Sequence, residues 1–501
     1  MVSTVSDLLA AAVRNFPGRP ALADEERTLT YAELAELVAG TAATIEARWG
    51  ADPGRVAIVG TNSIATVAAR IAVGAMGAVG IPIQSNQPAA QVAGTLAAAE
   101  TDRLLLTDAS RPDHAAEAGA DALLATSVAD LIAAAPATGV PSAARPDGVE
   151  SITFTSGSTG TPKAVVKTHE SVVASVFAFS MICPRRPTDV ELISAPLTRV
   201  PFHNIYLATM YAGGMVRVLD RFDAVGYARE VGRLGAVRSF LPLTCWIDIR
   251  AADEAARQPI DSLRQVILGG QPIPLDLKAW LLERLPGAQV CDLYGGTEGQ
   301  GIVAEGEDML FHGAGYIGRP FPLSEATILV DGATGVVDRE GEILLGGPTL
   351  MRGYLHAHDN ETAFHGAWLR TGDLGRMDAA GRFWVTGRVK DVIISGGYNV
   401  HAEEVSEYLR GAAGIRDAAV VGVPDPRWGE AVAAAVVVEP GVDLKAVRAR
   451  CKGDLAFYKV PKHLVPVEEL PRTATGKVAA KEVARIVEER LLAPQEVSRG
   501  E

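Results

Sequence analysis

Short apolar runs alternate with alanine-rich stretches of helical spacing through about the first 300 residues of the chain. Residues 56–59 and 79–83 are predicted strands, and residues 63–75 and 88–99 are the predicted helices that follow them. Strands that are apolar throughout and separated by helices are typical of parallel sheets covered by helices on both faces. The pattern therefore predicts an α/β fold for this part of the chain.

The pattern changes in residues 324–386, where short predicted strands at 326–330, 341–345 and 383–385 alternate with glycine turns. Short strands separated by turn residues favour a smaller antiparallel or barrel-like subdomain.

A domain boundary is predicted near Arg388-Val389-Lys390-Asp391, which divides the chain into residues 1–388 and 389–501. The second part has the pattern of a small α+β unit. Its predicted elements are a helix at 402–409, strands at 417–423 and 431–438, and a helix at 444–455. The polar segment 494–501 is predicted to be disordered.

Size and composition narrow the class of protein. A chain of 501 residues is too long for one compact core, so two or more domains are expected. Hydrophobic residues make up 48% and charged residues 21%, which is ordinary for a soluble globular protein. The net charge of -13 disfavours nucleic acid as the main partner, and an anionic substrate would need local positive charge.

The cysteines and the N-terminus favour a cytoplasmic location. The four cysteines lie far apart without a C-x-x-C pair, which suits a reducing cytosol and indicates neither a structural zinc nor a disulfide framework. Residues 1–14 have the spacing of an amphipathic helix and lack the features of a signal peptide. No apolar run reaches about 20 residues, so no membrane span is expected.

The segment 154–163, Phe-Thr-Ser-Gly-Ser-Thr-Gly-Thr-Pro-Lys, carries the strongest chemical signal. Its glycines let backbone N–H groups approach a ligand, its hydroxyls can donate to phosphate oxygens, and Lys163 adds a compact positive charge. The G-x-x-x-x-G-K-[ST] spacing of the common P-loop is absent. The segment predicts a polyphosphate-binding loop, with a flexible polar turn as the alternative.

Glycine-containing segments elsewhere carry further candidates. In Tyr294-Gly295-Gly296-Thr297-Glu298 the carboxylate could hold Mg²⁺, which prefers oxygen ligands and bridges protein and phosphates. Gly269-Gly270-Gln271-Pro272 would let a flat base lie against the backbone. Asp373, in Trp368–Asp373, could accept hydrogen bonds from both ribose hydroxyls, and Arg388 follows in the next such turn. Each segment, taken alone, is also an ordinary turn.

Two more segments carry candidate residues, each with an ordinary alternative. Lys477 ends Pro471-Arg472-Thr473-Ala474-Thr475-Gly476-Lys477, where it could reach a distant site and neutralise developing negative charge, or simply be a surface lysine. His356, His358 and Asp359 resemble a metal site, but no further ligand follows at the usual spacing, so a metal role is rejected.

The order and separation of these segments resemble the adenylate-forming superfamily, which contains acyl- and aryl-CoA ligases, adenylation domains of peptide synthetases and beetle luciferases. The resemblance covers nearly the whole chain, from Leu29-Thr30-Tyr31-Ala32-Glu33-Leu34 to Lys477. The matching segments are Thr155–Lys163, Tyr294–Glu298, Gly341–Tyr354, Trp368–Asp373, Gly387–Asn399 and Pro471–Lys477. It implies a large N-terminal domain of two mixed parallel sheets with helices plus a small β-barrel-like subdomain, and a small, mobile α+β C-terminal domain.

The resemblance also implies roles for single residues. The loop residues that would close over the β- and γ-phosphates of ATP are Thr155, Ser156, Gly157, Ser158, Thr159, Gly160 and Lys163. Glu298 would hold Mg²⁺, and Thr297 would donate to the α-phosphate and the substrate carboxylate. The adenine positions are Gly270, Gln271 and Tyr294, and the ribose positions are Asp373 and Arg388. Lys390 matches the hinge, Lys477 the lysine that bridges carboxylate and α-phosphate, and Gly397 and Tyr398 the loop that lines the pantetheine tunnel.

The implied reaction has two steps at one site. A carboxylate attacks the α-phosphate of ATP to give an acyl-adenylate and pyrophosphate, and a thiol then displaces AMP. Because both partners of the first step are anions, their approach needs Mg²⁺ and Lys477 to offset repulsion. A swing of the C-terminal domain would remove Lys477 and bring in Gly397 for the second step.

The acid is expected to bind among residues 198–206, 243–246 and 295–301. The candidate pocket residues are Arg199, Phe202, His203, Asn204, Trp246, Gly295, Gly296 and Gly301. The first stretch lacks the aspartate that pairs the ammonium of α-amino acids in peptide-synthetase domains, and its His-Asn pair is similar to that of domains that activate hydroxybenzoates. Arg199 takes the place of a histidine usual in CoA ligases, where it could pair an extra acidic group or face solvent. A small aromatic or short-chain acid is favoured over a long fatty acid.

Alternatives stay open for the acceptor of the acyl group and for the class of reaction. CoA is the expected acceptor, while the phosphopantetheine of an acyl carrier protein, an amine, or another oxyacid in place of the carboxylate stay open. A luciferase-like oxidation and a catalytically dead nucleotide-binding protein are the competing classes. The presence of Lys163, Glu298, Asp373 and Lys477 speaks against the dead protein. The sequence assigns no oligomeric state.

Overall fold

The computed structural model describes residues 2–107, 119–124, 128–135, 139–155, 163–270, 273–389, 392–395, 398–425, 429–455, 458–473 and 476–492. The chain forms two compact units. The first comprises Met1–Ala326, Leu344–Arg370 and Gly381–Phe383, and the second comprises Thr327–Ile343, Thr371–Ala380 and Trp384–Glu501.

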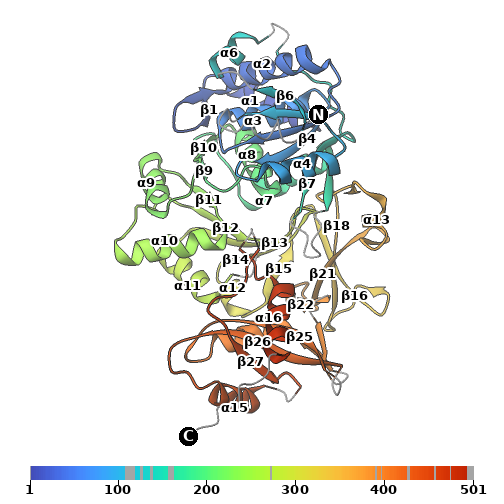
Figure 1. Cartoon of the computed structure of the whole chain (residues 1–501). Coiled ribbons are helices and arrows are strands. Elements are labelled where there is room, and N and C mark those ends of the chain that lie inside the picture. Colours follow the sequence, from blue (N-terminus) through green and yellow to red (C-terminus); the bar gives the residue numbers. More distant parts are fainter. Residues whose placement is uncertain are drawn as a thin grey trace. The chain divides into compact units, whose positions relative to one another are not determined.

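Within the described part of the first unit, seven strands form a sheet in the order β19-β8-β7-β4-β3-β5-β6 (Figure 1). The strands are β3 (Arg55–Gly60), β4 (Val79–Gln84), β5 (Arg103–Leu106), β6 (Asp121–Leu124), β7 (Val149–Phe154), β8 (Ala164–Thr168) and β19 (Gly353–Tyr354). Strands β3 to β7 run parallel, whereas β8 is antiparallel to both β7 and β19.

Both faces of this sheet are covered by helices, as the continuous apolar runs predict. Val56 and Ile58 of β3 belong to a core shared with α2 (Tyr31–Trp49) and α3 (Ile64–Ala75). Their neighbours Ala57 and Val59 point to the other face, where they share a core with residues of α4 (Ala89–Ala98).

A second sheet of the first unit has the strand order β15-β14-β13-β12-β11-β9-β10-β1-β2. The strands are β1 (Pro20–Ala23), β2 (Thr28–Thr30), β9 (Val190–Ile193), β10 (Met215–Val218), β11 (Arg238–Phe240), β12 (Gln265–Gly269), β13 (Gln289–Gly295), β14 (Gln300–Glu305) and β15 (Tyr316–Pro320). Strands β1 and β9 to β13 run parallel to one another, whereas β2 is antiparallel to β1 and β14 is antiparallel to β13.

The helices of this unit begin where the sequence supplies caps. At α2 the Thr30 side chain accepts from the Glu33 N–H while the Glu33 carboxylate accepts from the Thr30 N–H, a reciprocal capping box. Thr4 and Asp7 do the same at α1 (Val5–Asn15). The other helices are α6 (Val128–Ala133), α7 (His169–Ile182), α8 (Val200–Tyr211), α9 (Ala224–Leu234), α10 (Leu243–Ala255), α11 (Leu275–Arg284), α12 (Asp308–Phe311) and α13 (Ala357–Asn360).

The glycine-rich segment forms paired strands in the order β17-β16-β18-β21-β22, and β20 pairs with β21. These are β16 (Glu325–Val330), β17 (Ala333–Thr334), β18 (Gly341–Gly346), β20 (Phe364–His365), β21 (Trp368–Met377) and β22 (Phe383–Arg388). The predicted strands at 326–330, 341–345 and 383–385 are thus observed, with β22 extending to Arg388.

The C-terminal part is an α+β unit whose sheet has the strand order β24-β23-β26-β25, with β27 paired to β26. Its elements are β23 (Val392–Ser395), β24 (Tyr398–His401), α14 (Ala402–Arg410), β25 (Ile415–Asp425), β26 (Gly429–Val438), α15 (Leu444–Asp454), β27 (His463–Pro466) and α16 (Ala480–Leu492). Val420 of β25 packs with α14, whereas Val421 packs with α16, so both faces are covered. The segment 494–501 lies outside the described residues.

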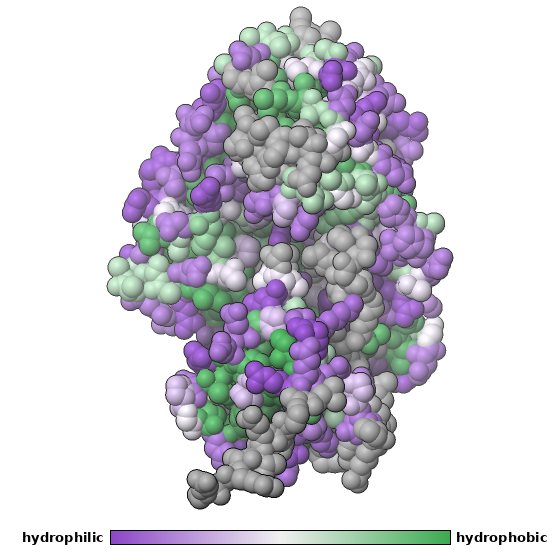
Figure 2. Space-filling model, viewed as in Figure 1, coloured by the Kyte–Doolittle hydropathy of each residue, from purple (hydrophilic) through white to green (hydrophobic). Residues whose placement is uncertain are grey.

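The predicted α/β class, with a large N-terminal part and a small α+β C-terminal part, is confirmed. In the part of the chain that the structure describes, no helix is both long and apolar enough to span a bilayer. Figure 2 shows a face on which hydrophilic side chains surround small hydrophobic areas.

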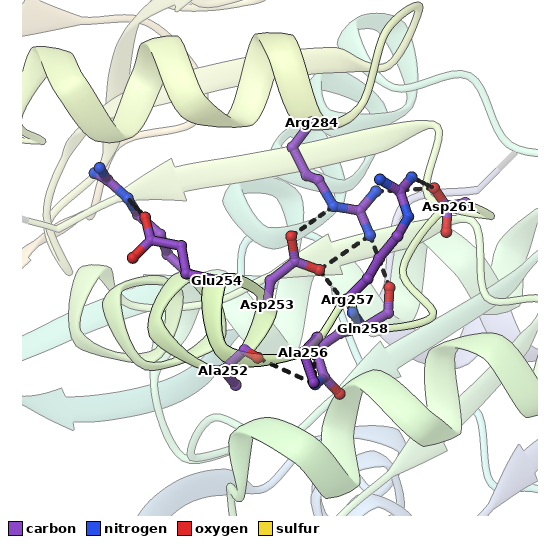
Figure 3. Close-up of polar contacts among 9 residues, drawn as sticks. Ala252, Asp253, Glu254, Ala256, Arg257, Gln258, Asp261 and Arg284 are labelled. Atoms are coloured by element: carbon purple, nitrogen blue, oxygen red, sulfur yellow. Dashed lines mark hydrogen bonds and ion pairs between the residues drawn. The ribbon is translucent and has the colours of Figure 1, made fainter.

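A buried arginine joins α10 to α11 (Figure 3). Arg284 donates from Nε to Asp253 Oδ2 at 2.8 Å and from Nη2 to the Gln258 carbonyl at 2.7 Å. Its Nη1 reaches Asp261 at 2.8 Å. The Arg284 side chain is 5% exposed, whereas Arg257, which also pairs with Asp261, is 70% exposed.

We expect Arg284→Met to lower the free energy of unfolding by about 3–5 kcal/mol, because it leaves the Asp253 carboxylate buried without its counter-charge. The matched change Arg257→Met, which removes the exposed partner of Asp261, is expected to cost less than about 1 kcal/mol. Urea unfolding followed by circular dichroism measures both. Equal losses for the two variants would contradict this account of the cluster.

Candidate active site

The predicted magnesium ligand lies in the turn between β13 and β14. The Gly296 N–H donates to the Gly299 carbonyl at 2.9 Å, which closes the turn around Thr297 and Glu298. The Glu298 carboxylate folds back over Gly296, where a Cβ would lie 2.8 Å from its Oε2. A larger residue at 296 would therefore displace the carboxylate, and this explains the need for glycine.

Glu298 is held by both its backbone and its side chain. Its carbonyl accepts from the Met351 N–H at 2.6 Å and from Lys167 Nζ at 3.1 Å. The Tyr354 hydroxyl donates to Glu298 Oε1 at 2.9 Å. These contacts place the carboxylate beside β8 and β19 of the seven-stranded sheet.

Lys167 is the most unusual charged residue of this region. It lies in β8 with 1% of its surface exposed, and it also donates to the Thr349 carbonyl at 2.9 Å. Burial lowers the pKa of Lys167 to about 7, although the charges of Glu298 and Glu150 oppose this shift. Lys167 thus fastens the Glu298 turn and the segment around Thr349 to one strand.

Both described ends of the predicted phosphate loop meet at the start of β8. The Thr155 N–H donates to the Lys163 carbonyl at 3.0 Å. Lys163 Nζ lies 3.6 Å from Asp359 Oδ1 and 4.6 Å from the centroid of the Tyr354 ring. The loop residues Ser156, Gly157, Ser158, Thr159 and Gly160 lie outside the described residues.

The donor set around Glu298 fits magnesium. Mg²⁺ in nucleotide sites is usually bound by one or two carboxylates together with substrate phosphates. Among the described residues no group of three or more His, Cys, Asp or Glu side chains could hold a metal. Glu298 supplies the carboxylate, and Lys163 supplies positive charge within the same unit.

Two of the predicted adenine positions emerge from neighbouring strands. Gly270 follows β12, Tyr294 lies in β13, and these parallel strands pair Gly269 with Leu293. Gly270 has φ +86°, in the left-handed region that favours glycine. Ligands of parallel sheets bind at the carboxyl ends of the strands, which is where both residues lie. Gln271 lies outside the described residues.

The predicted ribose residues face each other on β21 and β22 in the second unit. Arg388 Nε lies 2.7 Å from Asp373 Oδ1. The Thr371 hydroxyl donates to the Ile343 carbonyl at 2.7 Å and accepts from the Asp373 N–H at 3.0 Å. The structure therefore brings Asp373 and Arg388 together as an ion pair on a supported turn.

Lys477 belongs to a short hairpin of the second unit. Its carbonyl accepts from the Thr473 N–H at 2.7 Å, and Arg472 bridges to Val478 in antiparallel fashion. The Arg472 guanidinium donates to the Gly476 carbonyl at 3.0 Å and to Asp417 of β25 at 2.6 Å. The predicted hinge Lys390 and the tunnel residue Gly397 lie outside the described residues, and the Tyr398 backbone pairs with Ser395.

The predicted acid-pocket residues of α8 are buried. The Phe202 ring packs 4.8 Å from that of Phe240. His203 Nε2 lies 3.0 Å from Glu150 Oε1 and its Nδ1 lies 2.5 Å from the Tyr206 hydroxyl. Because both ring nitrogens are engaged, His203 would have to exchange a partner to contact an acid.

Other pocket candidates differ in their surroundings. Asn204, Trp246 and Gln300 are at most 1% exposed. Within the described part of the chain, both amide atoms of Asn204 and Gln300 and the indole N–H of Trp246 have no hydrogen-bond partner. Arg199 precedes α8 and is exposed. A side chain at Gly301 would collide with Leu345, and one at Gly295 with the Gly299 carbonyl oxygen.

Sequence reasoning missed Lys167, Tyr354 and Asp359 as members of this site. Lys167 follows the apolar run 164–166 and Tyr354 closes one of the matching segments, but neither fact indicates which groups these side chains contact. Asp359 was weighed only as a metal ligand, and it pairs instead with Lys163.

In metal-free protein, we expect the stability advantage of the wild type over Lys167→Met to grow with pH between about 7 and 10. Below pH 7 the lysine is charged in both states, and the folded state carries the cost of burying that charge. Above it the folded state releases the proton that the unfolded state keeps, with an ordinary pKa near about 10.4, so stability rises by up to about 1.4 kcal/mol per pH unit. Urea unfolding of both proteins across this range measures the difference, and parallel pH curves would contradict the shift.

Residues 9–355 match the AMP-binding enzyme family, and residues 404–477 match the AMP-binding enzyme C-terminal domain. Feruloyl-CoA synthase from Amycolatopsis sp is 32% identical over 474 residues, which cover 91% of this chain and 94% of that protein. The long-chain-fatty-acid–CoA ligase FadD13 of Mycobacterium tuberculosis is 30% identical over 470 residues, covering 90% and 91%.

The fold is similar to that of o-succinylbenzoate CoA synthetase from Bacillus subtilis in complex with its acyl-adenylate intermediate. The TM-score is 0.85 at 27% identity, covering 95% of this chain and 97% of that one. The prediction of an acid–thiol ligase is confirmed at the level of the family, because these relatives are named as CoA ligases or synthetases. The resemblance to adenylate-forming enzymes is likewise confirmed, and the chain belongs to the AMP-binding enzyme family.

Proposed function

We propose that this AMP-binding enzyme activates a small aromatic or short-chain carboxylic acid with ATP and transfers the acyl group to the thiol of CoA. The observation that carries the proposal is the placement of Glu298 and Lys163 on either side of Tyr354, at the end of a hydroxyl-rich loop. A carboxylate and a lysine at such a loop suit a triphosphate that comes with a divalent cation.

In the first step a carboxylate oxygen of the acid attacks the α-phosphorus of ATP, and the bond to pyrophosphate breaks. Lys163 and the loop Thr155–Gly160 would hold the β- and γ-phosphates, and Thr297 would donate to the α-phosphate. Mg²⁺, when bound at Glu298, would offset the repulsion between the anionic partners. Gly270, Gln271 and Tyr294 would hold adenine, and Asp373 with Arg388 the ribose.

The second step needs different donors at the same carbon atom. The thiol of CoA displaces AMP from the acyl-adenylate, so the amine that served the first step has to leave. We propose residues 389–501 as a mobile cap that hinges at Lys390, withdraws Lys477, and brings Gly397 and Tyr398 to line the thiol's path.

The acid class rests on the pocket candidates. Phe202 and Trp246 are aromatic residues of the proposed pocket stretches, and no aspartate in residues 201–206 could pair an ammonium. The unpartnered atoms of Asn204 and Gln300 favour an acid with a polar substituent, which would satisfy them. The names of the feruloyl and o-succinylbenzoate relatives point to aromatic acids, and FadD13 makes a long-chain acid the second candidate.

The acceptor also has a second candidate. The phosphopantetheine of an acyl carrier protein presents the same thiol arm as CoA and would use the same tunnel. The experiment on acceptors therefore compares CoA with a phosphopantetheinylated carrier protein.

Pyrophosphate release over a panel of acids tests the proposal. We expect release that requires an acid but no CoA, followed by formation of a thioester only when CoA is added. Benzoates and cinnamates with ring hydroxyls are expected to exceed both unsubstituted and long-chain acids in kcat/KM. Absence of acid-dependent pyrophosphate release across the whole panel would refute the proposed function.

Lys477→Ala is expected to slow the first step by at least about a hundredfold, because it removes a charge that acts on the developing negative charge. Formation of the thioester from a supplied acyl-adenylate is expected to remain within about twofold of the wild type. Single-turnover measurements of each half-reaction test this. Equal losses in both steps would contradict the separate role of Lys477.

A further inference from the structure

Tyr354 touches both charged groups on which the proposed nucleotide site depends. Its hydroxyl donates to Glu298 Oε1 at 2.9 Å, and its ring lies 4.6 Å from the Lys163 ammonium. One side chain therefore orients a carboxylate and carries a cation on its face, and these are separate chemical properties of the phenol.

The backbone around Tyr354 is fixed. Tyr354 pairs with Val165 in the antiparallel contact of β19 with β8, the strand that begins directly after Lys163. The Tyr354 N–H donates to Asn360 Oδ1 at 2.8 Å, and Asn360 Nδ2 donates to the Tyr354 carbonyl at 2.8 Å. These contacts hold the backbone of Tyr354, and so the point from which its ring projects, in one position.

We propose that Tyr354 is a positioning residue that sets the distance and orientation between Glu298 and Lys163, so that one nucleotide can meet both. The proposal rests on the proposed function. Without the hydroxyl, the Glu298 carboxylate would lose the donor that holds Oε1 and could rotate about its terminal bond. Without the ring, Lys163 would lose the electron-rich aromatic face that attracts its ammonium.

The phenol is suited to this task because its O–H group donates directly to the Glu298 carboxylate. A hydrogen bond from a neutral donor to a charged acceptor is also among the stronger kinds in proteins.

Asp359 gives an internal comparison. Its carboxylate lies 3.6 Å from Lys163 and is 15% exposed, but it has no contact with Glu298 among those the structure describes. A nucleotide phosphate would replace this carboxylate at Lys163. Removal of the Asp359 charge should therefore favour nucleotide binding, whereas removal of Tyr354 should oppose it.

Calorimetric titration with a non-hydrolysable ATP analogue, with and without Mg²⁺, separates these contributions. For Tyr354→Phe, which keeps the ring, we expect unchanged Kd without Mg²⁺ and about tenfold weaker binding with Mg²⁺. Tyr354→Leu is expected to show the same loss with Mg²⁺ and a further two- to fivefold loss, also present without Mg²⁺ (about 0.5–1 kcal/mol). Asp359→Asn is expected to bind about two- to fivefold more tightly in both conditions.

The ratio of the two Kd values within one protein does not depend on how much of it is folded, so partial unfolding of a variant leaves the test of the hydroxyl valid. The test of the ring compares Kd values between variants, so each is corrected for the folded fraction measured by circular dichroism. Tyr354→Phe with the wild-type ratio would overturn the role of the hydroxyl, and identical results for Phe and Leu would overturn the role of the ring. If the wild type itself bound no analogue, the proposed function would fail, which is a different result from wild-type binding with unaltered variants.

Discussion

A buried ammonium group joins the parts of the chain on which the site depends. Lys167 donates to the carbonyls of Glu298 and Thr349, which are 131 and 182 residues away in sequence. Burying a charge in β8 costs free energy unless the charged group is hydrogen-bonded, and the two backbone carbonyls accept hydrogen bonds from this ammonium. The Glu298 turn, the segment before β19 and the end of the loop 154–163 meet at β8. The buried lysine is therefore placed where one strand determines the positions of all three segments.

The charges of the site oppose the field of the whole chain. The protein carries a net charge of -13, yet the groups beside the loop include Lys163 and Lys167 close to Glu298. In the described structure Lys163 pairs with Asp359, the Glu298 carboxylate accepts a hydrogen bond from Tyr354, and Lys167 donates to the Glu298 carbonyl. When a triphosphate and its cation bind, these charged groups would exchange one set of charge partners for another. This exchange costs less free energy than leaving the charged groups without partners in a partly buried site.

The pattern of apolar residues predicted much of the fold, because a strand that is buried on both faces of a sheet is apolar at every position. Strands at 56–59 and 79–83 are apolar throughout since Val56 and Ile58 meet one core and Ala57 and Val59 another. The ends of β25 were missed because Ile415 and Asp425 lie where the apolar pattern gives way to polar residues. Lys167 could not be foreseen as buried, since a lysine in a strand is normally exposed, and its partners are set by tertiary contacts that no local pattern contains. The same holds for Tyr354 and Asp359, whose roles follow from the pairing of β19 with β8.

The proposed reaction divides its charged groups between the two units. Glu298, Lys163 and Tyr354 belong to the first unit, whereas Lys477, Asp373 and Arg388 belong to the second. Lys477 lies in a hairpin that is closed by its own backbone bonds and tied to β25 through Arg472 and Asp417. In the proposed reaction the arrival and departure of Lys477 are movements of residues 389–501, the proposed cap that carries this hairpin. A cation that is needed in one step and unwanted in the next is therefore better placed on a moving domain than on a flexible loop. A domain that moves as a rigid body would bring the cation to a defined position in one state and remove it in the other.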